Sequence, residues 1–187
     1  MPRQLLLSSS FASRTSHGGE IRKGKRKLAR PIDPKRPLHL VMRSTRARGE
    51  LSLLKTKHRK PIETLLRQTA QRFQIRIYGY ANVGNHLHLL IQGKDRKSIQ
   101  NFLRVAAGKI ALLVTQAKKG QAFGRFWDLL AFSRVVEWGR GFRTLRNYII
   151  KNLIDVVNAD LSWKEIERAM RFQSSQGPPA HSLILKY

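Results

Sequence analysis

Residues 75–91 read IRIYGYANVGNHLHLLI, two alternating apolar segments joined by the turn-forming residues 82–85. An apolar residue at every second position is the pattern of a β-strand, so these residues predict a β-hairpin. Successive side chains of a strand point to opposite faces, which places His86 and His88 on one face and the intervening leucines on the other. Two imidazoles side by side on a strand form half of a divalent-metal site. Satisfied polar residues are the alternative interpretation of this pair.

The segments that flank this hairpin predict an α+β fold. The predicted order is strand, helix, strand, strand, helix, strand, which is that of a ferredoxin-like split β-α-β sandwich. Such a fold has a four-stranded antiparallel sheet with two helices on one face, so the histidines are expected on the opposite, open face. The flanking segments are a strand at 38–43, a helix that starts at Pro61 and runs to Phe73, a helix from Ile99 to Ala117 and a strand within 126–138.

Three parts of different composition are expected along the chain. Residues 1–37 are rich in Ser, Gly, Pro, Lys and Arg and are expected to form a flexible basic arm. Residues 38–158 form the main domain, and its last segment, 142–158, adds an amphipathic C-terminal helix to the sandwich. Residues 159–187 hold a further helix that opens with a capping box at Ser162, followed by a loose tail. The arm either lays cations into a DNA minor groove or acts as an unspecific electrostatic tail.

The composition indicates a nucleic-acid partner. Among 187 residues, 37 Lys and Arg stand against 11 Asp and Glu, which gives a formal net charge of +26 at pH 7 and a pI near 11.6. A polyphosphate backbone attracts such a charge, and binding is expected to weaken with salt because each neutralised phosphate releases condensed counterions. A ribosomal-type RNA binder fits this composition as well as an enzyme does. The sequence contains neither a long apolar segment nor a separate basic amphipathic helix, the two features that would indicate a membrane partner.

The absence of cysteine removes several classes of site. Disulfides, thiolate zinc centres and cysteine nucleophiles are all excluded. The first eight residues contain three consecutive leucines, too few for the apolar core of a secretory signal peptide, so a cytoplasmic location is expected.

A tyrosine and an amide on the C-terminal helix complete a set of residues suited to phosphodiester chemistry. Tyr148 and Asn152 are four positions apart, so they lie one helical turn apart on the same side. A divalent ion held by His86, His88 and Asn152 would polarise a scissile phosphate. Tyr148 would then attack phosphorus and form a covalent phosphotyrosine, which conserves bond energy so that a DNA hydroxyl can rejoin the strand.

Each of these features is weak when taken singly. A tyrosine on an amphipathic helix is more often a core residue than a nucleophile, and it is the combination with the histidine pair and the positive charge that favours catalysis. Two histidines and an amide favour Mg²⁺ or Mn²⁺ over structural zinc, although histidine also leaves Zn²⁺ open.

Several segments together carry a resemblance to a known family. They are LHLVMR at 38–43, Tyr80 with NHLHLLI at 85–91, Phe126-Trp127 with Arg134-Val135, and LRNYIIKN at 145–152. On these segments the chain resembles the single-tyrosine HUH transposases, and most closely the REP-associated tyrosine transposases, from about Leu38 to Asn158. The resemblance implies that His86 and His88 are metal ligands, Tyr148 the nucleophile and Asn152 the third ligand. It also implies single-stranded or hairpin DNA as substrate and a 5′-phosphotyrosine linkage.

Other positions leave alternatives open. Gly84 and Leu153 stand where these transposases commonly have proline. His39 either faces the site or is a satisfied structural histidine. Tyr78 and Tyr80 either stack unpaired bases from the open face of the sheet or pack in the protein.

The sequence as a whole predicts a metal-dependent, single-stranded DNA endonuclease and strand transferase that acts as a monomer or homodimer. The alternative is a non-catalytic DNA- or RNA-binding protein that retains the same fold. Phosphate contacts are expected from the basic residues Arg22, Lys23, Lys25, Arg26, Lys27, Arg43, Arg76, Arg143, Arg146 and Lys151.

Overall fold

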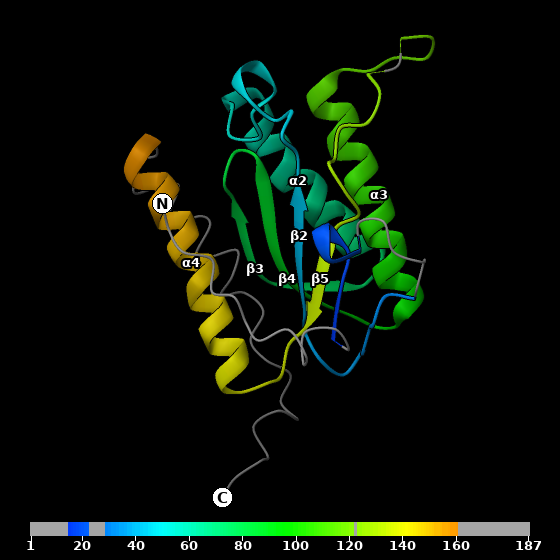
Figure 1. Ribbon diagram of the computed structural model, residues 1–187, viewed down its shortest axis with the longest axis vertical. Coiled ribbons are helices and arrows are strands. Elements are labelled where there is room, and N and C mark those ends of the chain that lie inside the picture. Colours follow the sequence, from blue (N-terminus) through cyan, green and yellow to red (C-terminus); the bar gives the residue numbers. More distant parts are fainter. Residues whose placement is uncertain (1–14, 23–28, 122, 161–187) are drawn as a thin grey trace, which may run out of the picture.

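The computed structural model describes residues 15–22, 29–121 and 123–160, in which five strands form an antiparallel sheet of order β1-β5-β2-β4-β3 (Figure 1). The helix expected from Ser162 onward lies outside these residues. The strands are β1 Ser16–His17, β2 Leu38–Arg43, β3 Ile75–Asn82, β4 His86–Gly93 and β5 Phe132–Val135. The helices are α2 Thr56–Arg72, α3 Arg96–Thr115 and α4 Arg140–Asp160, with short 3-10 helices η1 Gly19–Arg22 and η2 Gly49–Leu51.

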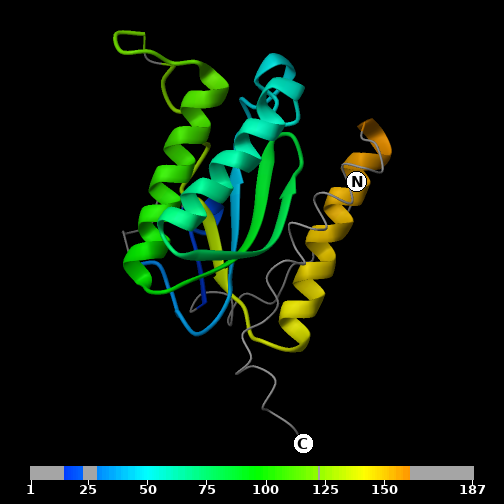
Figure 2. The same ribbon diagram turned by 180° about the vertical axis from the view of Figure 1, so that it is seen from behind.

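The order β2-α2-β3-β4-α3-β5 confirms the predicted ferredoxin-like sandwich. Strands β3 and β4 form the predicted hairpin, and β4 also pairs with β2 in the centre of the sheet. Helices α2 and α3 lie together over one face of the sheet, as the view from behind shows (Figure 2).

The main core lies between these two helices and the sheet. Leu87, Leu89 and Ile91 of β4 point into it from the sheet, as their spacing of two residues along a strand predicts. Phe102 of α3 and Leu66 of α2 meet them from the helices, and these five side chains have no measurable exposure. Burial of such side chains stabilises the fold by roughly 2 kcal/mol each, so this face fixes the register of β4 and with it the direction of its histidines.

The sheet has one strand more than the four predicted, because β1 pairs with the edge of β5. Gly18 then turns the chain with φ of 82°, and a Cβ there would lie 2.1 Å from the carbonyl oxygen of Ala131, so only glycine fits. Arg30 donates from Nη1 to the oxygen of Ala131 and to Oγ of Ser133, at 2.8 and 2.5 Å. Parts of the range 1–37, expected to be a flexible arm, therefore pack against the sheet.

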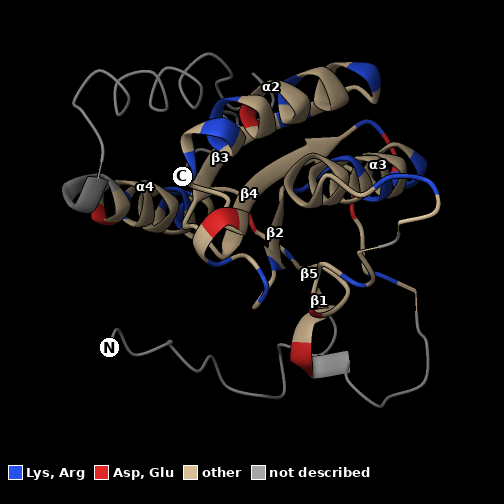
Figure 3. Cartoon of the chain, turned by 90° about the horizontal axis from the view of Figure 1, so that it is seen from above, with Lys and Arg blue, Asp and Glu red and all other residues tan. Residues whose placement is uncertain are grey.

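Helix α4 packs on the face of the sheet that was expected to be open, over strands β3 and β4. Seen end-on, α4 lies on one side of the strands and α3 on the other (Figure 3). Phe142, Ile149 and Leu153 of α4 form a second buried cluster with Leu90 of β4 and Tyr78 of β3. Leu90 provides this contact because it is the apolar residue that follows the histidines on their own face of β4.

A bulge in β3 places Tyr78 and Tyr80 on opposite faces of the sheet, although both were expected on one face. Ile77 and Gly79 pair with consecutive residues of β4, so Tyr78 is an extra residue in the strand. The extra residue shifts the alternation, and Tyr78 faces α4 whereas Tyr80 lies in the main core. Their exposed fractions are 1% and 6%, so both pack in the protein instead of stacking bases.

Two element boundaries differ from those expected. Helix α2 begins at Thr56, so the start predicted at Pro61 was wrong, and the proline lies inside the helix. Of the segment 126–138 only β5 is a strand, and most of the rest is irregular. None of the helices in the described part of the chain is long and apolar enough to span a membrane.

Candidate active site between the sheet and helix α4

Strand β4 places two histidines on the face of the sheet that α4 covers. The ring centroids of His86 and His88 are 4.8 Å apart, and the ring planes meet at 72°. His88 has an exposed fraction of only 5%, whereas His86, the first residue of the strand, is half-buried. The alternation of the sequence therefore sets the direction of both imidazoles, and the packing around His88 determines how little solvent reaches it.

Each of the two imidazoles has a partner at Nδ1. His86 Nδ1 lies 2.6 Å from Oδ1 of Asn85, an amide oxygen that can only accept, so His86 carries a proton on Nδ1. His88 Nδ1 lies 3.3 Å from Nε2 of His39 on β2. Nε2 of His88 is buried and has no hydrogen-bond partner within the described residues. Such an atom is costly to bury unless a ligand binds it.

Burial and neighbouring positive charge keep the histidines neutral. Burial, and after it the charges of His39 and His86, lower the pKa of His88 to about 3. Burial and then Arg134 lower the pKa of His39 to about 4, and burial and then Arg43 lower the pKa of His86. Because a metal ligand must offer a nitrogen lone pair, imidazoles that stay neutral suit a divalent cation.

Helix α4 brings Tyr148 against His88. The two ring centroids are 5.8 Å apart and the planes meet at 85°, an edge contact. Tyr148 has an exposed fraction of 49%, so a substrate can reach it. Asn152 follows one turn later on the same side of α4, and its amide nitrogen is buried without a partner in the described structure. The site therefore combines an accessible phenol with two unsatisfied buried polar groups.

These residues fit a divalent cation. The described part of the chain has no group of three or more His, Cys, Asp or Glu side chains that could hold a metal ion, so a third ligand beside His86 and His88 must be of another type. The carbonyl oxygen of the Asn152 amide is of a type that divalent cations accept as a ligand. The unpartnered buried Nε2 of His88 is the group that a bound ion would satisfy, whereas the unpartnered Nδ2 of Asn152 is a donor and leaves the amide oxygen as the atom that can bind a cation.

The turn before His86 requires glycine where the resemblance suggests proline. Gly84 has φ of 87°, which proline cannot adopt, and its N–H donates to Oδ1 of Asn82 at 3.0 Å. Its carbonyl accepts from the N–H of Leu53 at 2.8 Å. The turn that precedes Asn85 and His86 is therefore held by two hydrogen bonds, and a proline at this position would remove the one that the Gly84 N–H donates.

The family model of IS200-like transposases matches residues 35–152, a range that contains every residue of this site. The chain belongs to the family of IS200-like transposases. No curated protein matches it.

Two solved structures resemble this IS200-like transposase. One is described as a REP-associated tyrosine transposase bound to a REP hairpin, with a TM-score of 0.51 and 10% sequence identity over 73% of this chain and 76% of that one. The other is a putative transposase from Deinococcus radiodurans R1, with a TM-score of 0.43 and 15% identity over 68% of this chain and 98% of that one. At these identities the likeness of the first concerns the fold.

The expected phosphate contacts of the transposase differ in their distance from the site. Arg43 is exposed and pairs in register with His86, so it lies beside the site. Arg143 and Arg146 project from other sides of α4 than Tyr148, because they precede it by five and two positions. Lys151 of α4 and Arg76 of β3 are exposed, Arg22 ends η1, and Lys23, Lys25, Arg26 and Lys27 lie outside the described residues.

Asp128, which the sequence does not single out, holds the end of β2 beside the site. Its Oδ1 accepts from the backbone N–H and the hydroxyl of Thr45, at 2.8 and 2.9 Å. Its own N–H donates to the carbonyl of Arg43 at 3.0 Å, and its Oδ2 lies 4.0 Å from Nε of that arginine. Asp128 thus holds the backbone at Arg43 next to His86. It was missed because it lies in an irregular segment without periodicity.

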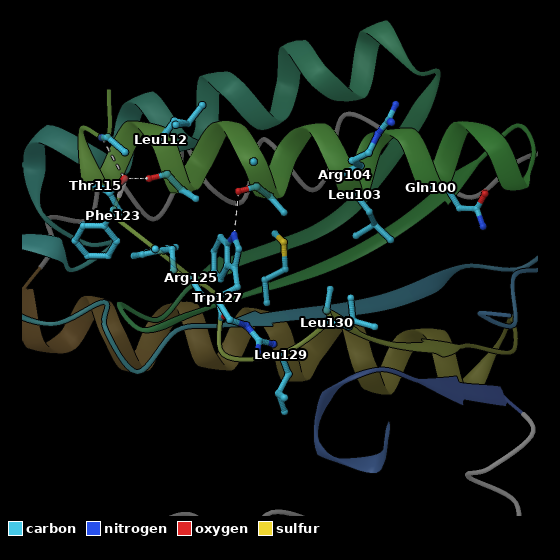
Figure 4. Close-up of a pocket in the computed structure, with 18 of the residues that line it drawn as sticks. Gln100, Leu103, Arg104, Leu112, Thr115, Phe123, Arg125, Trp127, Leu129 and Leu130 are labelled. Atoms are coloured by element: carbon cyan, nitrogen blue, oxygen red, sulfur yellow. Dashed lines mark hydrogen bonds between the residues drawn. The ribbon is translucent and has the colours of Figure 1, made fainter. Parts of the chain in front are cut away.

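A groove of about 990 Å³ runs along α3 (Figure 4). Its lining includes Met42 of β2, which belongs to the main core and so lies on the opposite face of the sheet from the histidines. Trp127 lies in it, fixed by a hydrogen bond of 2.9 Å from its indole N–H to the carbonyl of Ala107. Arg104 and Arg125 are among its cationic residues, and no acidic residue is among the described residues that line it. Because β2 and β4 intervene, a ligand in this groove would not touch His88.

His39 and His88 make the stability of the metal-free transposase depend on pH. In the unfolded chain both titrate near 6.5, whereas in the folded protein their pKa values are about 4 and about 3. The unfolded state therefore binds more protons between these values, so this stability is complete above pH 6.5 and is lost as the pH falls through the window. Each histidine is expected to contribute a slope of more than about 1 kcal/mol per pH unit.

Urea denaturation of the metal-free protein at a series of pH values measures this slope. The variant His88→Gln removes one of the two titrating groups and is expected to show a shallower dependence. Equal slopes for the variant and the natural protein would contradict the assignment.

Proposed function

We propose that this IS200-like transposase cleaves and rejoins single-stranded DNA through a covalent phosphotyrosine at Tyr148. The observation that carries the proposal is the contact between the half-exposed Tyr148 ring and His88, 5.8 Å between centroids. A phenol beside two neutral imidazoles with available nitrogens is the arrangement of a nucleophile next to a metal site. The family supports DNA transposition as the setting of this chemistry.

The proposed reaction is a transesterification that conserves one phosphodiester bond. The Tyr148 oxygen forms a bond to phosphorus, the bond from phosphorus to the 3′ oxygen breaks, and the 5′ phosphate remains on the tyrosine. The phenol loses its proton and the leaving 3′ oxygen gains one. A 3′ hydroxyl from the same or another strand reverses these steps, and the tyrosine is released without consumption of a nucleotide cofactor.

We propose that His86, His88 and Asn152 hold a divalent cation, Mg²⁺ or Mn²⁺. The cation, when bound, supplies Lewis-acid polarisation of the scissile phosphate. The protein residues keep their own roles, because Asn85 orients His86 through the 2.6 Å hydrogen bond and α4 sets the position of Tyr148 against His88. Zn²⁺ is an alternative ion for the same ligands.

We propose a DNA hairpin with a single-stranded flank as the substrate. The structurally similar transposase was solved with a REP hairpin, and the net charge of +26 of this chain suits a polyanion. Arg43, exposed beside His86 and 4.0 Å from Asp128, is the described cation best placed to contact a phosphate at the site. A monomer or homodimer and a cytoplasmic location stay predictions.

Incubation of the full chain with hairpin oligonucleotides and Mn²⁺, followed by denaturing electrophoresis, tests this function. A 5′-phosphotyrosine mechanism gives a protein adduct that retains a label at the 3′ end of the DNA. A label at the 5′ end instead appears on a free fragment with a 3′ hydroxyl. Binding without an adduct in Mg²⁺, Mn²⁺ or Zn²⁺ would support the non-catalytic DNA- or RNA-binding protein.

A further inference from the structure

Strand β2 contributes a third imidazole to the site, that of His39. It lies on the same face of the sheet as His88, one residue pair further along, because Val41 is the residue opposite His88 and His39 is opposite Leu90. Its exposed fraction is 9%. His39 has no part in the proposed bond-making steps, and a polar ring buried at this place requires a hydrogen-bond partner.

The rings of His39 and His88 meet edge to edge in nearly one plane. Nε2 of His39 and Nδ1 of His88 are 3.3 Å apart, the ring planes differ by 8°, and the centroids are 5.5 Å apart. The centroid distance exceeds the nitrogen distance by about two ring radii, so the two nitrogens lie on the line that joins the rings. This is the geometry of an in-plane hydrogen bond and not of face-to-face stacking.

The direction of that hydrogen bond decides whether His88 can bind a metal ion. A neutral imidazole has one N–H and one nitrogen with a lone pair. If His88 donates from Nδ1, its buried and unpartnered Nε2 holds the lone pair. If His88 instead accepts at Nδ1, Nε2 holds a proton and cannot bind a cation.

The neighbouring histidine shows which direction serves a metal site. His86 donates from Nδ1 to the amide oxygen of Asn85 at 2.6 Å, which leaves its own Nε2 with the lone pair. Metal-binding histidines generally have such an acceptor on the second nitrogen, and it fixes both the tautomer and the ring orientation. Nε2 of His39 lies at Nδ1 of His88, just as the amide oxygen of Asn85 lies at Nδ1 of His86.

We infer that His39 is a positioning residue whose Nε2 accepts the Nδ1 proton of His88, so that the Nε2 lone pair of His88 is held ready for the cation. The function that we assign to this hydrogen bond rests on the proposed metal site. The tautomer that it assigns to His88 is a property of the metal-free protein and can be measured there.

Long-range ¹H–¹⁵N NMR of the metal-free full chain reports the tautomer of His88, and titration with Mn²⁺ reports metal affinity. Three substitutions separate the hydrogen bond from packing. His39→Phe keeps a ring without an acceptor, His39→Gln places an amide oxygen near the position of Nε2, and His39→Asn is too short to reach. His58→Phe is the control, because His58 is also buried but lies on α2, where its ring contacts the carbonyl of Ser52 at 2.8 Å.

We expect His88 of the natural protein to carry its proton on Nδ1. His39→Phe and His39→Asn are expected to shift the proton towards Nε2 and to weaken Mn²⁺ binding by about 10- to 100-fold, whereas His39→Gln and His58→Phe keep both properties. A merely structural role would affect thermal stability and leave the tautomer unchanged.

Two results would overturn the inference. One is a natural protein in which His88 is protonated on Nε2, and the other is a folded His39→Phe variant with unchanged tautomer and Mn²⁺ affinity. If the tautomer responds as expected but no DNA adduct forms with any metal, the role of His39 is supported and the proposed DNA chemistry fails.

Discussion

Replacement of Tyr148 by phenylalanine is expected to abolish the covalent DNA adduct while DNA binding is retained. The substitution removes only the oxygen that would bond to phosphorus, and the ring that contacts His88 stays in place. Loss of a covalent nucleophile lowers turnover by roughly 10⁴-fold or more. The cationic surface is unchanged, so the affinity for a hairpin oligonucleotide, measured by gel shift at fixed salt, should stay within a few-fold of the natural protein.

The matched control for this variant is Tyr78→Phe. Tyr78 points from β3 to the face of the sheet on which α4 packs, but unlike Tyr148 it is buried. Its hydroxyl donates to Oε1 of Gln92 at 2.8 Å. Its loss should cost about 1 kcal/mol of stability and leave the adduct intact. An adduct that persists in Tyr148→Phe would show that another residue is the nucleophile.

The elements that the sequence predicts well are those whose signal is local. The hairpin of β3 and β4 and the long stripe of α3 follow from periodicity alone, and the direction of His86 and His88 follows from the buried leucines that alternate with them. The bulge at Tyr78 could not be predicted in this way. It depends on a register between two strands, and it changes which face every later residue of β3 occupies.

Contacts between distant segments account for the features that the sequence did not reveal. Strand β1 has only two residues in a polar and basic segment, and it forms because β5 offers a free edge. The burial of His88 reflects packing that the open-face model of the sheet did not include. His39 was an open alternative and Asp128 was missed, because their partners, His88 and Arg43, are far from them in sequence.

Removal of the proposed histidine ligands is expected to abolish Mn²⁺ binding and DNA cleavage together. His86→Ala is the cleaner variant because His86 is half-buried, whereas His88→Ala also removes a buried ring from between β4 and Tyr148. We expect each to weaken Mn²⁺ binding by more than the roughly 100-fold that loss of an outer hydrogen-bond partner can cause. Isothermal titration calorimetry measures the affinity, and the adduct assay in the same Mn²⁺ series measures cleavage.

Substitution of Asn152 tests whether its amide is the third ligand of the proposed metal site. Asn152→Asp keeps an oxygen donor and adds a negative charge, so it is expected to retain Mn²⁺ binding, whereas Asn152→Leu has a similar size without a donor and should lose it. His58→Ala controls for the loss of a buried histidine, since it perturbs α2 without touching the site. Equal Mn²⁺ affinity in Asn152→Leu and the natural protein would remove Asn152 from the site, and His86 and His88 would then need an oxygen ligand from the DNA itself.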